Sequence, residues 1–243
     1  MKQRLDRALV ERNLTSTRSQ AESYIKLGFV SVDNKIVNQP SHMVDDKNNL
    51  SINLENQYVS RAGLKLASVA DSLDLDFKEK TVLDVGSSTG GFTDYALRHL
   101  AKRVIAVDVG KDQLHPSLRT NKSIELYEQT DIRDVSDLSS PIDLVLIDVS
   151  FISLRSILPK IHQLSNKNTN IVAMFKPQFE AGSSAKHKGV IKNDKIRRQI
   201  LFDFESWLKQ NHFLIVKQAD SKIQGSKGNK ERFYLLRKER FTS

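Results

Sequence analysis

The stretch TVLDVGSSTGGF, residues 81–92, decides the fold. It begins with a short apolar segment, TVLDV, of the kind that forms a buried β-strand. A carboxylate, Asp84, stands near the end of that segment, and Gly86, Gly90 and Gly91 follow it. Glycine lets a backbone turn tightly and approach a ligand closely. The stretch therefore predicts a strand that ends at a ligand-binding loop.

Strands and helices alternate along the chain around this stretch. Amphipathic helical segments, such as FTDYALRHL and IRRQILFDFESWLKQ, separate most of the strand candidates, and the predicted helix SRAGLKLASVADSLDL precedes the first strand. This alternation predicts an α/β domain with a doubly wound, mostly parallel sheet. The other strand candidates are residues 103–110, 124–129, 143–150, 170–175, 213–219 and 231–237.

The first 59 residues differ in pattern, and we expect domains at 1–59 and 60–243. RLDRALVER places Leu5, Ala8 and Leu9 on one helical face, and RSQAESYIKLG is a second helix that ends at Gly28. FVSVDNKIVNQP alternates as a hairpin that turns at Asp33-Asn34. Two short helices and a hairpin enclose a very small core, which is typical of an attached module.

Composition excludes several classes of protein. The 243 residues include no cysteine, which rules out disulfides, zinc–thiolate sites and cysteine nucleophiles, and no metal site is predicted. There is no run of eighteen apolar residues, so no membrane span is expected. The charged N-terminus is unlike a secretory signal. The absence of cysteine fits a cytoplasmic protein, which is the location we expect.

The net charge of +9 is concentrated in one segment. Residues 183–240 contain fifteen Lys or Arg and six Asp or Glu, whereas charges nearly cancel elsewhere. A basic surface of this kind indicates a polyanionic partner, most simply a nucleic acid. No oligomeric state is predicted.

Acidic residues stand at or just after the ends of three successive strands, where ligands bind in open α/β sheets. An acid such as Asp108, at the end of the second strand, accepts hydrogen bonds from ribose hydroxyls, and Asp131, after the third strand, can meet an adenine amino group. The glycine spacing is D-x-G-x-x-x-G-G, not the dinucleotide pattern G-x-G-x-x-G. S-adenosylmethionine fits these acids better than NAD, with its ammonium group near Asp84. The candidate cofactor-binding residues are Asp84, Gly86, Ser87, Ser88, Thr89, Gly90, Gly91, Phe92, Asp108 and Asp131.

Charged residues also end the fourth and fifth strands, at Asp148 and Lys176. If the last strand runs antiparallel, Glu231 at its start lies at the same edge, and Lys65 on the helix before the first strand can reach it. Methyl transfer to an alcohol requires that the acceptor proton be drawn away. An amine can take that proton only when its pKa falls toward neutrality, as burial and a second ammonium group promote.

Six segments together resemble the TlyA family: SRAGLKL, LDVGSSTGGFTD, DVGKDQLHPSLR, LVLIDVSFISL, KPQFE and GNKERFYLL. Proteins of this family are called haemolysins by history and are ribosomal-RNA ribose methyltransferases by chemistry. The resemblance implies a Rossmann-like class I methyltransferase sheet of the FtsJ type, with an antiparallel last strand. It also implies that residues 1–59 form a small α+β RNA-binding domain, named after ribosomal protein S-four.

The same resemblance implies a reaction and a set of residues. S-adenosylmethionine would be the methyl donor, and the acceptor would be a ribose 2′-hydroxyl in ribosomal RNA, as free RNA or in a ribosomal subunit. The family's Lys-Asp-Lys-Glu tetrad corresponds to Lys65, Asp148, Lys176 and Glu231. In the N-terminal module, the residues expected to contact phosphates are Arg4, Arg7, Arg18 and Lys26.

Three other interpretations remain open. One is a non-enzymatic RNA-binding factor for ribosome assembly with a degenerate pocket, against which the intact glycine loop and complete tetrad argue. Another is a membrane-active haemolysin, although the sequence has no long apolar amphipathic helix. The third is a nucleotide oxidoreductase, which the missing G-x-G-x-x-G pattern opposes.

Overall fold

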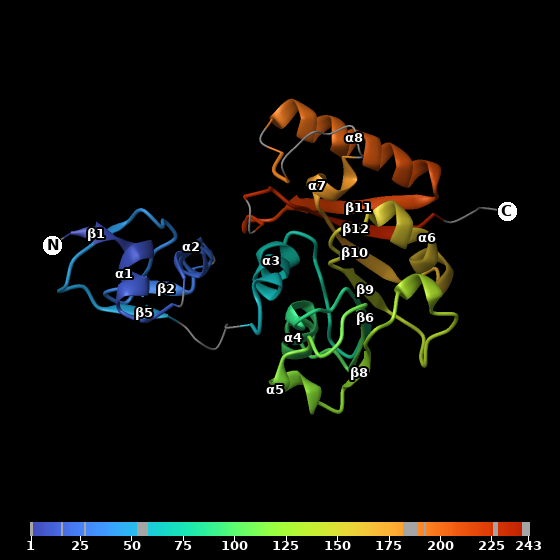
Figure 1. The fold of residues 1–243 in the computed structure, drawn as a ribbon, viewed down its shortest axis with the longest axis horizontal. Coiled ribbons are helices and arrows are strands. Elements are labelled where there is room, and N and C mark those ends of the chain that lie inside the picture. The colour runs from blue at the N-terminus through green and yellow to red at the C-terminus, as the bar shows by residue number, and fades with distance from the viewer. Residues whose placement is uncertain are drawn as a thin grey trace.

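The structure is a computed structural model that describes residues 2–15, 17–26, 28–52, 58–181, 189–191, 193–225 and 228–239. Part of the basic segment predicted to meet nucleic acid, residues 183–188, 192, 226–227 and 240, lies outside these ranges. Figure 1 shows a small N-terminal unit beside a larger unit built on one sheet.

The large unit contains a seven-stranded sheet with the order β11-β12-β10-β9-β6-β7-β8. All pairs among β8, β7, β6, β9 and β10 are parallel, whereas β12 runs antiparallel to both β10 and β11. The predicted mostly parallel sheet with an antiparallel last strand is therefore confirmed. The strands are β6 Thr81–Val85, β7 Arg103–Val107, β8 Ile124–Tyr127, β9 Leu144–Ile147, β10 Asn170–Phe175, β11 Phe213–Asp220 and β12 Arg232–Lys238.

Helices cover both faces of this sheet (Figure 1). Alternate strand residues point to opposite faces, so Leu83 and Val85 belong to one core cluster and Val82 to the other. The first cluster is completed by α6 and α8, and the second by α3 and α4. The helices are α3 Arg61–Ala70, α4 Gly91–Arg98, α5 Pro116–Arg119, α6 Leu154–Leu164, α7 Pro177–Glu180 and α8 Asp194–Gln210.

Helix α3 is shorter than the predicted helix SRAGLKLASVADSLDL. It ends at Ala70, and the chain turns through Asp74, whose φ of 48° is left-handed. Leu73 is fully buried in the turn, and the Leu75 amide donates to the Ala70 carbonyl. The apolar residues after Ala70 thus face the core from a turn.

The N-terminal unit has the predicted helices and hairpin. Leu5, Ala8 and Leu9 of α1 are fully buried, and the hairpin turns at Asp33 and Asn34, which both have positive φ. Three further strands, β1, β4 and β5, complete the unit. The sequence did not predict them, because segments of two or three residues carry no periodic signal. The elements are β1 Gln3–Arg4, α1 Leu5–Glu11, α2 Arg18–Lys26, β2 Val30–Val32, β3 Lys35–Ile36, β4 Met43–Val44 and β5 Leu50–Ile52.

The core of the N-terminal unit continues into the large unit. Its hydrophobic cluster includes Leu64 of α3 and Ile223, which lies between β11 and β12. Both side chains are almost completely buried. This shared packing holds the N-terminal unit near the end of the sheet where α3 begins and β12 starts.

Candidate active site

The strand directions bring four predicted residues to one edge of the sheet. Asp148 follows the end of β9, and Lys176 follows the end of the parallel strand β10. Because β12 is antiparallel to β10, with Phe175 opposite Arg232, Glu231 begins β12 at that same edge. Lys65 reaches the edge from α3.

The tetrad forms two ion pairs. Lys176 Nζ lies 2.5 Å from Asp148 Oδ1, and Lys65 Nζ lies 2.6 Å from Glu231 Oε2. All four side chains are at least 85% buried. A charge is tolerated at this depth only when it is paired, and each lysine here has its own carboxylate.

Two cavities flank these ion pairs. One, of about 290 Å³, is lined by Lys65, Lys176 and Glu231 together with the aromatic residues Phe151 and Phe179. The other, of about 250 Å³, is lined by Lys65, Lys176 and Asp148 and extends along the glycine loop. The lysines thus stand between two spaces that ligands can enter.

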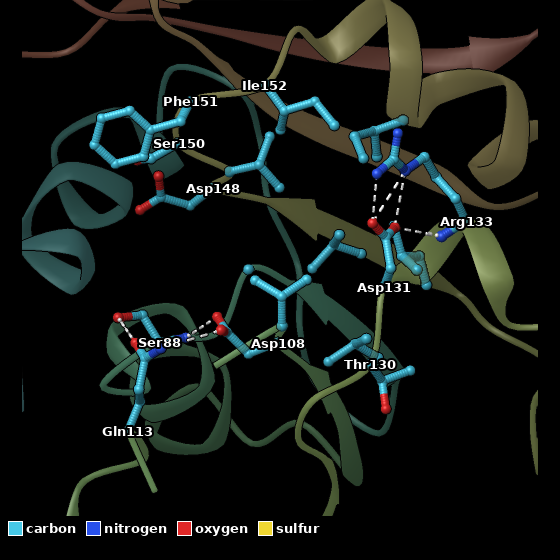
Figure 2. Close-up of a pocket in the computed structure, with 17 residues that line it drawn as sticks. Ser88, Asp108, Gln113, Thr130, Asp131, Arg133, Asp148, Ser150, Phe151 and Ile152 are labelled. Atoms are coloured by element: carbon cyan, nitrogen blue, oxygen red, sulfur yellow. Dashed lines mark hydrogen bonds and ion pairs between the residues drawn. The ribbon is translucent and has the colours of Figure 1, made fainter. Parts of the chain in front are cut away.

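A third cavity, of about 560 Å³, opens over the ends of β6, β7 and β9 (Figure 2). Asp108 lies at its wall and accepts a hydrogen bond from the Ser88 amide at 2.8 Å (Figure 2). It accepts another from the Gly110 amide at 2.7 Å. Gln113 hydrogen-bonds the Ser88 hydroxyl and lines the same cavity. These contacts hold Asp108 beside the cavity.

Asp131 also faces this cavity and is held by Arg133 (Figure 2). Its carboxylate accepts hydrogen bonds from the Arg133 amide, Nε and Nη2 at 2.6 to 3.1 Å. The hydrogen bonds from the Arg133 side chain keep the pKa of Asp131 below its usual range. An ionised acceptor therefore lines this end of the cavity.

Asp84 is the most deeply buried acid of the site. Burial raises its pKa to about 7, although Thr93 Oγ1 donates to its Oδ2 at 2.7 Å and opposes that shift. Within the described residues, Asp84 Oδ1 and the Ser87 hydroxyl are buried without a hydrogen-bond partner. Both residues line the 250 Å³ cavity. Two unsatisfied polar groups beside a cavity suit a polar ligand.

The glycines of the loop have different tasks. Gly86 lines two cavities, and a Cβ there would lie 2.6 Å from the Asp148 carbonyl oxygen. A Cβ on Gly91 would lie 2.2 Å from Ser60 Oγ, so this glycine permits close packing of α4 against the start of α3. Gly90 is the N-cap of α4. Of the ten candidate cofactor-binding residues, Gly90 and Gly91 line none of the three cavities, whereas the other eight do.

Three residues near the tetrad were not predicted from the sequence. Ser150 accepts a hydrogen bond from Lys176 Nζ at 2.8 Å. Phe151 is 91% exposed with a φ of 66°, and its ring centroid lies 5.2 Å from that of Phe179. A bulky residue with positive φ is an outlier that often marks a functional loop. The only sequence signal for Ser150 and Phe151 was their place two and three residues after Asp148.

The third residue is Glu180, the last of the KPQFE motif. It accepts hydrogen bonds from the Ser153 hydroxyl and the Leu154 amide, both at 2.6 Å, and pairs with Arg155. Burial raises its pKa against these contacts. Glu180 thereby fastens α7, which follows Lys176, to the N-terminus of α6 and fixes the loop between β9 and α6.

The predicted phosphate-contacting residues of the N-terminal unit divide into two groups. Arg4 and Arg18 donate to Asp6, whose side chain is fully buried. Burial would raise the pKa of Asp6, but these two hydrogen bonds outweigh it and hold that pKa below its ordinary value. Lys26 lies 4.0 Å from a Glu22 oxygen, whereas Arg7 is exposed and forms no ion pair with a described residue.

The described residues contain neither a metal-binding cluster nor a membrane-spanning helix. No three His, Asp or Glu side chains there are placed to hold a metal ion. No helix in that part of the chain has the length and apolar composition needed to cross a membrane.

The sequence matches two known families and several known proteins. The pattern of the FtsJ-like methyltransferase family matches residues 58–238, and that of the S4 domain matches residues 3–49. The 23S rRNA (cytidine-2′-O)-methyltransferase TlyA of Campylobacter jejuni is 44% identical over 179 residues, which cover 73% of this chain and 70% of that protein. The 16S/23S rRNA (cytidine-2′-O)-methyltransferase TlyA of Mycobacterium tuberculosis is 33% identical over 96% of this chain and 89% of its own length.

A solved structure gives the same result. A hemolysin-named protein from Streptococcus thermophilus superposes with a TM-score of 0.73 at 34% identity, covering 98% of this chain and 89% of that one. The resemblance predicted from the six sequence segments is confirmed by these matches.

Proposed function

Because the chain belongs to the FtsJ-like methyltransferase family, we propose that it transfers a methyl group to a ribose 2′-hydroxyl of ribosomal RNA. The observation that carries this proposal is the juxtaposition of the Lys176–Asp148 and Lys65–Glu231 ion pairs between two cavities. A donor placed in one cavity and an acceptor placed in the other meet at these lysines.

S-adenosylmethionine suits the donor side. The 560 Å³ cavity offers Asp108 to ribose hydroxyls and the ionised Asp131 to an adenine amino group (Figure 2). The adjoining cavity offers the unpartnered Asp84 oxygen to an ammonium group. When bound, this donor supplies a methyl group on a positively charged sulfur, whose bond electrons remain on sulfur as the methyl group leaves.

The chain's own residues then have defined tasks. Lys176 takes the proton of the 2′-hydroxyl as the ribose oxygen attacks the methyl carbon, a task that an amine performs only in its neutral form. Asp148 holds Lys176 and stabilises the ammonium group that forms. Lys65, paired with Glu231, lines the 290 Å³ and 250 Å³ cavities. It brings positive charge to the developing alkoxide.

The acceptor side suits RNA. Phe151 lies exposed where the 290 Å³ and 560 Å³ cavities adjoin, and an exposed aromatic ring can stack on a base that leaves its helix. The S4-domain match at residues 3–49 supplies a module for phosphate contacts. We extend the cytidine specificity in the names of the two relatives to this chain, with free RNA or a ribosomal subunit as substrate in the cytoplasm.

The test uses the full-length protein, purified ribosomal subunits and S-adenosylmethionine labelled in the methyl group. A 2′-O-methyl group removes the internal nucleophile that cleaves RNA in alkali, so the label should appear in an alkali-resistant dinucleotide that contains cytidine. DNA of the same sequence, which lacks the 2′-hydroxyl, should not be labelled. A label recovered as a modified base in a single nucleotide would contradict the ribose assignment.

A further inference from the structure

The three cavities of the site share one residue, Ser150. It lines the large cavity over β6, β7 and β9, the smaller cavity along the glycine loop, and the cavity beside Lys65 and Glu231. Among the residues that the structure describes, no other lines all three. The proposed function places the transferred methyl group where donor and acceptor spaces meet, and Ser150 stands at that junction.

Ser150 also accepts a well-aligned hydrogen bond from Lys176. Its Oγ accepts a hydrogen bond from Lys176 Nζ at 2.8 Å. Asp148 Oδ1 lies at 2.5 Å from the same nitrogen, but outside hydrogen-bond geometry. Ser150 is therefore the one aligned acceptor that the described residues offer to Nζ.

The two contacts constrain the amine differently. Attraction to Asp148 fixes where Nζ lies, but attraction between charges depends only weakly on direction. A hydrogen bond prefers a nearly linear arrangement, so Ser150 fixes rotation about the Cε–Nζ bond. A neutral amine has two N–H groups and one lone pair. With one N–H directed to Ser150, the negative charge of Asp148 favours the second N–H on its own side, and the lone pair occupies the remaining position.

We propose that Ser150 is a positioning residue for Lys176, whose hydroxyl orients the amine so that its lone pair faces the ribose 2′-hydroxyl. This inference rests on the proposed function and assigns a role that the tetrad alone leaves open. In the step, the 2′-hydroxyl proton moves to that lone pair, the ribose oxygen forms its bond to the methyl carbon, and the carbon–sulfur electron pair stays on sulfur.

The surroundings of Ser150 argue against a purely structural task. Its side chain is exposed, and it does not cap α6, because Ser153 is the N-cap of that helix. Glu180 holds the loop through Ser153 and Leu154. The loop therefore has its own anchors when the Ser150 hydroxyl is removed.

The experiment compares Ser150→Ala, Ser150→Thr and the control Ser156→Ala, which removes an exposed hydroxyl from α6. Ser150→Ala should lower kcat about tenfold, or about 1.4 kcal/mol, with KM for ribosomal subunits and Kd for S-adenosylmethionine within twofold of wild type. Ser150→Thr keeps a hydroxyl and should recover most of kcat, and Ser156→Ala should match wild type.

A second measurement does not depend on turnover. In protein labelled with ¹⁵N-lysine, the Nζ protons of Lys176, assigned with Lys176→Arg, should exchange with water at least threefold faster in Ser150→Ala than in wild type or Ser150→Thr. Unchanged exchange, an unchanged kcat, or a fall in kcat matched by weaker donor binding would each overturn the positioning role. If the Nζ protons of Lys176 exchange faster in Ser150→Ala than in wild type, but the wild type transfers no methyl group, the proposed function is refuted. The Ser150–Lys176 contact is then still supported.

Discussion

Phe175 of β10 lies opposite Arg232 of the antiparallel strand β12, and this register sets Lys176 and Glu231 at one edge of the sheet. A parallel last strand would place Glu231 at the opposite edge, far from the carboxyl ends of β9 and β10. The direction of β12 therefore decides whether the tetrad can form. Lys65 completes it from α3 through its ion pair with Glu231.

The proton-transfer role of Lys176 predicts a specific failure of arginine at that position. Lys176→Ala should lower kcat on the order of 10²-fold or more while donor affinity stays near that of wild type. Lys176→Arg can keep the charge beside Asp148 but should not restore turnover, because a guanidinium group keeps its proton. Single-turnover methylation and calorimetric titration of the donor would measure both effects, with the exposed Lys167→Arg as control. A fully active Lys176→Arg enzyme would show that the residue acts by charge alone.

The Lys65–Glu231 pair predicts non-additive effects on stability. Glu231 is 3% exposed, and breaking a buried ion pair leaves an uncompensated charge, which costs about 3 kcal/mol. Lys65→Met should therefore destabilise the protein by about that amount, whereas the double variant Lys65→Met/Glu231→Leu should lose less than the sum of the two single variants. Urea denaturation of the four proteins of this cycle measures the coupling. Additive losses would mean that the pair is too solvated to matter.

Much of the site could be predicted from strand ends. Asp84, Asp148 and Lys176 each stand in or after an apolar segment, and the carboxyl ends of parallel strands meet at one edge. The position of Glu231 depends on the direction of the last strand. That direction is set by hydrogen bonds to β10, so the sequence could predict it only through resemblance to a known family.

The remaining contacts depend on side chains that are distant in sequence. Glu180 anchors the loop before α6, yet nothing in its own segment predicts Ser153 or Leu154 as partners. In the N-terminal unit, the sequence did not predict that Asp6 would be buried. Its burial engages Arg4 and Arg18, which the sequence predicts only as phosphate contacts.

The different surroundings of Arg7 and Arg18 predict two different effects of substitution. Arg7 is exposed, so Arg7→Gln should weaken binding to ribosomal RNA, reduce the slope of log K against log salt by about 1, and leave stability unchanged. Arg18→Gln removes one of two partners of the buried Asp6 and should lower the free energy of unfolding by about 1 kcal/mol. Salt-dependent RNA binding and urea denaturation of both variants separate the roles. Equal effects of the two substitutions on both measurements would contradict the division.

The raised pKa of Asp84 predicts that pH has opposite effects on donor binding and on the stability of the donor-free protein. Its pKa is raised to about 7 by burial, whereas an aspartate in the unfolded chain titrates near pH 4. The folded state thus holds this proton more tightly, so the contribution of Asp84 to stability decreases as pH rises through this interval. The total loss is on the order of 4 kcal/mol. Asp84→Asn carries no ionisable group and should be more stable than wild type at pH 8 without the donor, as urea denaturation at pH 5 and pH 8 would show.

Donor affinity should change with pH in the opposite direction, because the ammonium group of the donor is attracted only to the ionised carboxylate. Between pH 6 and pH 8 the ionised fraction of a group with a pKa of about 7 rises about tenfold, so donor affinity should rise by a similar factor. In Asp84→Asn this dependence should disappear and binding should be weak at both values, whereas Asp203→Asn, an exposed change on α8, should behave as wild type. Isothermal titration at the two pH values measures the effect. A wild-type affinity that does not change with pH would mean that Asp84 does not receive the ammonium group, and the unpartnered Oδ1 would then require another ligand atom.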